Sequence, residues 1–71
     1  MVVYKLLTNR EYDVLTRLHK TSNTIAEELN VSVNTITTVI QRIQSKLNAK
    51  NRTEMVIKAI KSGLVDINSF D

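Results

Sequence analysis

The stretch "NTITTVIQRI", residues 34–43, decides the fold of this 71-residue chain, because its composition and its spacing favour different structures. Residues 35–40 are all β-branched, and Thr, Val and Ile favour strands by propensity. A half-buried strand needs apolar and polar residues in strict alternation, which this stretch does not have. Its apolar residues instead recur at i, i+3, i+4, i+7 and i+11, at Ile36, Val39, Ile40, Ile43 and Leu47. This spacing predicts a helix with one buried face.

The composition of the chain excludes several classes of protein. Without Cys, and with His19 as the single His, neither a disulfide framework nor a metal site is expected, and no nucleophile–base pair suggests an enzyme or a cofactor. No apolar run approaches the roughly 18 residues of a membrane span, and no signal-peptide pattern is present, so we expect a cytoplasmic protein. The absence of Pro and the single Gly favour an all-α helical bundle.

The charge is distributed unevenly. Residues 1–30 balance, whereas residues 31–61 carry six basic residues against Glu54, a net charge of +5. A basic half beside a neutral half is a plausible footprint for nucleic acid. A solvated Lys/Arg surface is the alternative on charge alone.

Start and stop signals predict four helices. Thr8 and Glu11 have the spacing of a capping box, and Leu7 and Tyr12 that of a hydrophobic staple. The first helix is expected to fade near residues 19–20. Its buried stripe is expected to contain Val14, Leu15, Leu18 and also Tyr12.

The second and third helices have the pattern of a helix-turn-helix unit. The second helix runs to Asn30, which tolerates the left-handed turn, and Ser32 is the expected N-cap of the third helix, residues 33–47. Ala26 is small, as two helices crossing closely require. A plain helical hairpin without DNA binding would give a similar stripe. The fourth helix begins at Asn51 or Thr53 and closes at Gly63, after which residues 64, 65 and 67 are expected to fold back as a hydrophobic tail.

Three segments carry a family resemblance: "LTNREYDVL" (7–15), "IAEELNVSVNTI" (25–36) and "KLNAKNRTEMVIKAIKSGLV" (46–65). In that order they resemble the LuxR/GerE-type DNA-binding domain. The resemblance implies a single domain, residues 1–71, folded as a four-helix bundle. Its helix-turn-helix would span about 22–47, with the third helix in the DNA major groove, and its fourth helix, about 52–63, would support dimerisation. The chain departs from the family at Thr37 and Val39, where basic residues or His are common.

The outer face of the third helix is expected to read base edges. Thr37, Thr38 and Gln41 share one outward face near the N-terminus of this helix, where recognition helices contact bases. Gln bonds an adenine edge and a Thr methyl packs on the thymine methyl, so A·T-containing half-sites are favoured. The expected base-contacting residues are Asn34, Thr37, Thr38 and Gln41.

Phosphate contacts are expected around this face. Arg42 and Lys46 flank it, and Lys50 lies in the loop before the fourth helix, while Arg52 is expected partly to brace the fold. The full set expected at phosphates is Ser22, Asn23, Thr24, Thr35, Arg42, Ser45, Lys46 and Lys50. The expected dimer interface is Glu54, Ile57, Lys58 and Lys61, with Ile57 as its apolar residue.

The sequence therefore predicts a transcriptional regulator that binds double-stranded DNA sequence-specifically as a homodimer, without a small-molecule ligand in this domain. Two alternatives stay open. A protein-interaction module on a degenerate helix-turn-helix would bind a regulator through Ile57 and its neighbours, and its interaction with DNA would be salt-insensitive and sequence-blind, or absent. A sigma-factor-like promoter-binding unit shares the opening motif, but such units usually end soon after the recognition helix.

Overall fold

The computed structural model describes residues 7–70, and within this range it contains four α-helices, one short 3-10 helix and no strand. The elements are α1 (Asn9–Leu15), α2 (Ser22–Leu29), α3 (Val33–Leu47), α4 (Arg52–Lys61) and the 3-10 helix η2 (Ile67–Ser69). The all-α class is confirmed. Residues 1–6 and 71 of the predicted domain lie outside the described residues. No described helix is both long enough and apolar enough to cross a membrane.

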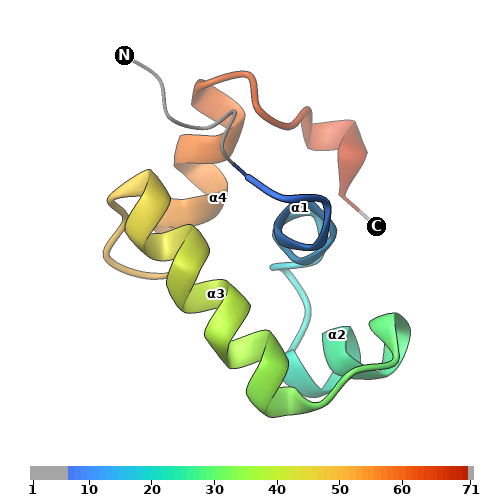
Figure 1. Cartoon of the computed structure of the whole chain (residues 1–71). Coiled ribbons are helices and arrows are strands. Elements are labelled where there is room, and N and C mark those ends of the chain that lie inside the picture. Colours follow the sequence, from blue (N-terminus) through green and yellow to red (C-terminus); the bar gives the residue numbers. More distant parts are fainter. Residues whose placement is uncertain (1–6, 71) are drawn as a thin grey trace.

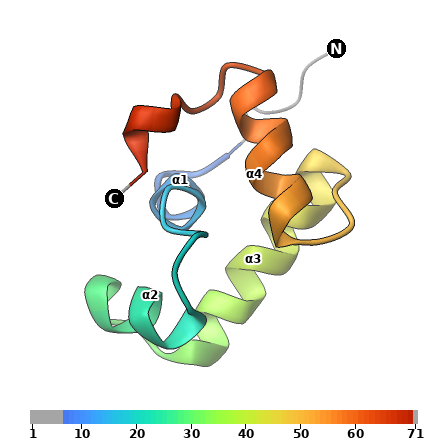
Figure 2. The same ribbon diagram turned by 180° about the vertical axis from the view of Figure 1, so that it is seen from behind.

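Helix α3 organises the molecule, because α1, α2 and α4 all pack against it. In Figure 1 it runs diagonally along the left side, with α4 above, α2 below and α1 seen end-on between them. The view from behind agrees, and it also shows the segment after α4 returning to the side of α1 (Figure 2). One long face of α3 is therefore left without a neighbouring helix.

The buried stripe of α3 is the one that its spacing predicts. Ile36, Val39, Ile43 and Leu47 are buried, and Ile40 is half-buried against the same core. They meet buried side chains of the three other helices, Leu15, Ile25 and Met55 among them. Each such side chain stabilises the fold by about 1.5–3 kcal/mol, which outweighs the few tenths of a kcal/mol that a β-branched residue costs in a helix. The stretch 34–43 is helical for this reason.

The N-terminal ends of α1, α3 and α4 and the C-terminal end of α4 follow the predicted caps. Thr8 Oγ1 accepts a hydrogen bond from the Glu11 amide at 3.1 Å, and the Glu11 carboxylate accepts one from the Thr8 amide at 2.9 Å, which completes the capping box. Ser32 caps α3 and Asn51 caps α4 through their side chains. Helix α4 ends at Lys61, and Gly63 follows with φ = 79°, a left-handed conformation that favours glycine.

Two predictions about α1 are wrong. The helix ends at Leu15 rather than near residues 19–20, because the chain then tightens into bonds of the i→i+3 type, Arg17 amide to Val14 carbonyl and Leu18 amide to Leu15 carbonyl. Leu18 remains buried in this tighter turn. Tyr12, expected in the buried stripe, is 39% exposed, since the inner face of α1 is filled by Val14 and Leu15.

The segment after α4 folds back only in part as a hydrophobic tail. Val65 is buried and Leu64 packs against the core. Phe70 also packs there, with its ring 5.8 Å from that of His19 in an edge-to-face arrangement. Ile67 is exposed, so its predicted burial is wrong. It lies in η2, whose tight turn directs it away from the core that Val65 and Phe70 reach.

Candidate nucleic-acid interface

The turn between α2 and α3 fixes the angle at which α3 is presented. Asn30 caps α2 with φ = 58° and ψ = 46°, the left-handed conformation expected for it. The Val31 amide then donates to the Ala26 carbonyl at 3.0 Å, which closes the turn. Ala26 is buried at the crossing of the two helices, and Val31 packs against the core. The geometry is that of a helix-turn-helix, with α3 as the second helix.

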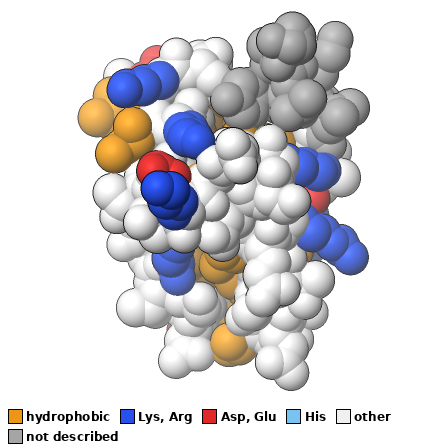
Figure 3. Space-filling model, turned by 90° about the vertical axis from the view of Figure 1, so that its left-hand side faces the viewer, with side chains coloured by type: hydrophobic (Ala, Val, Ile, Leu, Met, Phe, Trp, Pro, Cys, Tyr) orange, Lys and Arg blue, Asp and Glu red, His pale blue; other side chains and the backbone are white. Residues whose placement is uncertain are grey.

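The uncovered face of α3 carries uncharged hydrogen-bonding side chains. The four predicted base-contacting residues, all exposed on α3, are Asn34, Thr37, Thr38 and Gln41. Figure 3 looks at this side of the molecule and shows it mostly white, with Lys and Arg side chains toward its margins. The Thr38 hydroxyl donates to the Asn34 carbonyl at 3.1 Å, so Thr38 presents its methyl group and oxygen lone pairs outward.

The two positions of α3 that depart from the family pattern, Thr37 and Val39, differ in burial. Val39 is buried in the core, so a change at this position concerns packing rather than the exposed face. Thr37 is exposed in the middle of that face. The exposed face of this chain is therefore uncharged at position 37, where the resemblance to the family leads us to expect a basic residue or His.

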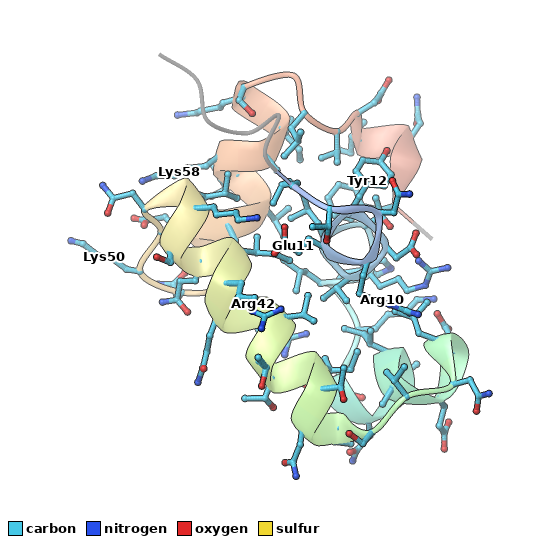
Figure 4. All side chains as sticks on the ribbon, viewed as in Figure 1. Arg10, Glu11, Tyr12, Arg42, Lys50 and Lys58 are labelled. Carbon is cyan, nitrogen blue, oxygen red and sulfur yellow. The ribbon has the colours of Figure 1, made fainter. Side chains whose placement is uncertain are left out.

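The basic residues around α3 fall into two groups. Arg42 and Lys50 are exposed, and Figure 4 shows the Lys50 side chain extending outward from the loop between α3 and α4. Lys46 is half-buried, and its Nζ lies 2.7 Å from Glu11 Oε1, in an ion pair that joins α3 to α1. The charge of Lys46 is thus compensated within the fold. Sequence reasoning missed this contact, because the capping box already accounted for Glu11 and 35 positions separate the two residues.

Glu11 is a buried carboxylate, only 3% exposed, that stays charged. Burial by itself would raise the pKa of Glu11. The hydrogen bonds from Lys46 and from the Thr8 amide, together with the positive charges of Lys46 and Arg42, outweigh burial and hold the pKa below its ordinary value of 4.5. Glu11 therefore serves both as the cap of α1 and as the anchor of α3.

The predicted phosphate-contacting residues of α2 and early α3 are near the surface, and several already have hydrogen bonds. Ser22 Oγ accepts from Arg52 at 3.2 Å, and Thr24 Oγ1 accepts from the Thr21 hydroxyl at 3.0 Å. Thr35 Oγ1 lies 3.0 Å from Ser32 Oγ. Asn23 and Ser45 are exposed. These five residues lie along α3 and at the N-terminus of α2. That they contact DNA stays a prediction.

Arg52 braces the fold, as the sequence in part predicted. Its guanidinium donates to the Lys20 carbonyl at 2.6 Å, to the Leu18 carbonyl at 3.3 Å and to Ser22. These bonds tie the start of α4 to the loop between α1 and α2. A second brace is the pair of ion pairs that Glu28 makes with Arg17 and Lys20 on the same loop.

The predicted dimer residues of α4 have different surroundings. Ile57 is 44% exposed, and Lys61 is exposed as well. Glu54 Oε1 accepts from the Lys50 amide at 2.7 Å, and Lys58 Nζ donates to the Asn48 carbonyl at 2.6 Å, at the C-terminal end of α3 (Figure 4). Glu54 and Lys58 thus hold the loop between α3 and α4. Among the described residues no group of His, Cys, Asp and Glu could hold a metal ion.

Comparison with known proteins agrees with this geometry. The model of the family "Bacterial regulatory proteins, luxR family" matches residues 5–59. The HTH-type quorum sensing-dependent transcriptional regulator VjbR of Brucella abortus is 40% identical over 67 residues, which cover 92% of this chain and 26% of VjbR. The transcriptional regulatory protein YxjL of Bacillus subtilis is 42% identical over 60 residues, covering 82% of this chain and 28% of YxjL.

A third relative is the response regulator protein VraR of Staphylococcus aureus, 32% identical over 65 residues, which cover 89% of this chain and 31% of VraR. The chain thus spans about a quarter to a third of the length of the curated relatives that it matches. These relatives are named as regulators, which supports the prediction that the chain is not an enzyme. With the four α-helices of residues 7–70 and their helix-turn-helix, the chain belongs to the luxR family of bacterial regulatory proteins.

Proposed function

We propose that this domain regulates transcription by binding double-stranded DNA, with α3 in the major groove. The observation that carries the proposal is the uncovered, uncharged face of α3 between exposed basic residues. An α-helix with its side chains is about 10–12 Å across and fits a major groove about 12 Å wide. Membership of a family of regulatory proteins supports the same function.

The proposed base contacts come from Asn34, Thr37, Thr38 and Gln41. An amide side chain such as Gln41 matches the N6 and N7 edge of adenine, and the Thr methyl groups match the thymine methyl. Because none of the four is charged, the face offers little attraction to DNA of any sequence. Sequence preference would therefore come from α3, and general affinity from residues outside this face.

The proposed phosphate contacts come first from Arg42 on α3 and Lys50 in the loop after it, which are both exposed. Lys46 would contribute less, since its ammonium group already neutralises Glu11. Ser22, Asn23 and Thr24 at the start of α2, with Thr35 and Ser45 on α3, would add uncharged contacts. Such contacts fix the orientation of the domain without reading sequence.

We also propose that two copies pair through α4 on DNA. Ile57 lies beside a hollow of about 250 Å³ whose lining includes Leu18, His19 and Val56. In a two-fold interface the same patch meets itself, so Ile57 of each copy would enter the hollow of the other. Lys61 lies on the exposed part of the same helix. Glu54 and Lys58 would act indirectly, by holding the loop that precedes α4.

Selection of duplexes from a random DNA pool with the full chain tests the function. We expect an enriched motif rich in A·T pairs, bound more tightly than a scrambled duplex of the same composition. One bidentate base contact alone corresponds to about 1–3 kcal/mol, a preference of roughly 5- to 150-fold. Absence of any enriched motif, with binding equal on all duplexes or undetectable, would instead favour the protein-interaction module.

A further inference from the structure

Val33 is an exposed apolar residue at the start of α3. It is 40% exposed and does not belong to the hydrophobic core, although its neighbours Val31 and Ile36 do pack there. The other exposed large apolar residues of the described chain lie on α1, α4 and η2, and are Tyr12, Ile57 and Ile67. Val33 is thus the one such residue of the described chain on the helix that the proposed function places in the groove.

The position of Val33 on the helix aligns it with the proposed reading residues. Val33, Thr37 and Gln41 are spaced i, i+4 and i+8, so they form one row along α3, beside Asn34 and Thr38. Side chains lean toward the helix N-terminus, which moves Val33 to the leading end of this row. Residues at the N-terminal end of a recognition helix are the ones that contact base edges.

Single exposed apolar residues are common on protein surfaces and need no function. Two observations distinguish Val33. It begins the row that contains Thr37 and Gln41, and it forms one wall of a hollow of about 490 Å³ at the turn between α2 and α3, which Asn23 also lines. Asn23 is a proposed phosphate contact. Val33 therefore shares a hollow with one residue proposed for the backbone and begins the row proposed for the bases.

We infer that Val33 is a specificity-determining residue, whose side chain packs on the C5 methyl group of one thymine in the major groove. This inference rests on the proposed function. The thymine methyl is the apolar feature of base edges in that groove, so it is the partner that a Val side chain fits there. The methyl is absent from the other three bases. Val33 would therefore select thymine against cytosine, the other pyrimidine.

The helix geometry places this thymine relative to the other contacts. At about 1.5 Å per residue, Val33 and Thr37 are about 6 Å apart along the axis of α3. With α3 lying along the groove, this is close to the rise of two base pairs at about 3.4 Å each. The Val33 thymine should lie about two base pairs from the base that Thr37 reads, at the edge of the A·T-rich half-site.

Replacing single thymines by uracil tests the inference, because this change removes the C5 methyl and leaves the base pair intact. The probe is the duplex that the full chain selects from random DNA. In the parent, one replacement should weaken binding about fourfold, as expected for one methyl group lost from an apolar contact. In Val33→Ala the same replacement should have no further effect. Ile67→Ala, which shortens an exposed apolar residue in η2, should respond like the parent.

The proposed function and the role of Val33 can be overturned separately. If the parent selects no motif, the proposed function and the inference about Val33 are both overturned. If a motif is selected and Gln41→Ala abolishes the preference, but no thymine methyl is coupled to Val33, only the inference is overturned. Circular dichroism of Val33→Ala should match that of the parent, since an exposed Val replaced by Ala loses no core contact and gains helix propensity. A loss of thymine discrimination with unchanged helicity supports the inference.

Discussion

Glu11 is the residue on which two parts of the fold depend, because it completes the capping box of α1 and holds Lys46 of α3. We expect Glu11→Gln to lower the free energy of unfolding by about 1–3 kcal/mol at neutral pH, the cost of losing a hydrogen bond to a buried charged group. The pKa of Glu11 is lower in the folded chain than its ordinary value of 4.5, so the stability it contributes is present above that value. This contribution is lost as the pH falls through the lowered pKa.

Urea unfolding between about pH 6 and pH 3 measures this contribution. The difference between parent and Glu11→Gln should shrink below about pH 4.5 as the carboxylate is protonated. The matched control is Glu27→Gln, which replaces an exposed carboxylate of α2. If the difference in free energy of unfolding between the parent and Glu11→Gln stays constant from about pH 6 to about pH 3, the charge of Glu11 does not contribute to stability.

Local residue patterns were sufficient to predict the caps, but not the Glu11–Lys46 pair. Thr8, Ser32 and Asn51 satisfy amides three residues ahead, so their roles can be predicted from neighbouring positions. The partner of Glu11 depends on how α1 and α3 cross, which is a tertiary property. The exposure of Tyr12 could not be predicted for the same reason.

At the scale of elements, Arg52 links α4 to the loop between α1 and α2 through three hydrogen bonds. We expect Arg52→Ala to lower the free energy of unfolding by about 1.5–3 kcal/mol, since two backbone carbonyls lose a charged donor. Arg52→Lys should lose less of the free energy of unfolding than Arg52→Ala but should not match the parent, because one ammonium group cannot reproduce the planar set of guanidinium donors. Lys61→Ala, an exposed basic residue of the same helix, is the control, and urea unfolding is the measurement. Equal stability of the two Ala variants would contradict the bracing role.

The sequence predicted α3 to the residue and α1 only in part, for a physical reason. Helix α3 has a long apolar stripe and a capping Ser32, so the apolar spacing and the cap residue both predict a helix at Val33–Leu47. After Leu15 the chain leaves the α-helix without Gly or Pro to mark the end. The i→i+3 hydrogen bonds of the Arg17 and Leu18 amides keep Leu18 in the core. This turn depends on the tertiary position of α2, which local sequence patterns do not give.

At the scale of the whole molecule, the uneven charge predicts how salt affects DNA binding. Arg42→Ala and Lys50→Ala should each weaken binding to selected and random duplexes alike, and each should lower the slope of log K against log salt by about one. Arg10→Ala, which removes an exposed charge from the start of α1, is the control. Fluorescence anisotropy across a salt series gives the slopes. Slopes equal to that of the parent would mean that Arg42 and Lys50 are only solvated.

Pairing of two copies is also a property of the whole molecule. A single DNA-binding module buries about 600–1,000 Å², less than a typical specific complex, so tight binding is expected only for a pair. Ile57→Asp should abolish cooperative binding to a duplex with two half-sites, because the Asp carboxylate would have to leave water to pack against Leu18 and Val56, where the Ile side chain packs favourably. Binding to one half-site and helicity should be unchanged, since Ile57 is exposed. Cooperativity equal to that of the parent would locate the interface elsewhere.

Gln41→Ala tests the claim that the outer face of α3 reads DNA sequence. Its affinity is measured on the duplex selected by the parent and on random DNA, with Asn68→Ala, which removes an amide from η2 on the other side of the molecule (Figure 1), as control. We predict a loss of about 1–3 kcal/mol on the selected duplex and little change on random DNA. Equal losses on both duplexes would contradict the claim.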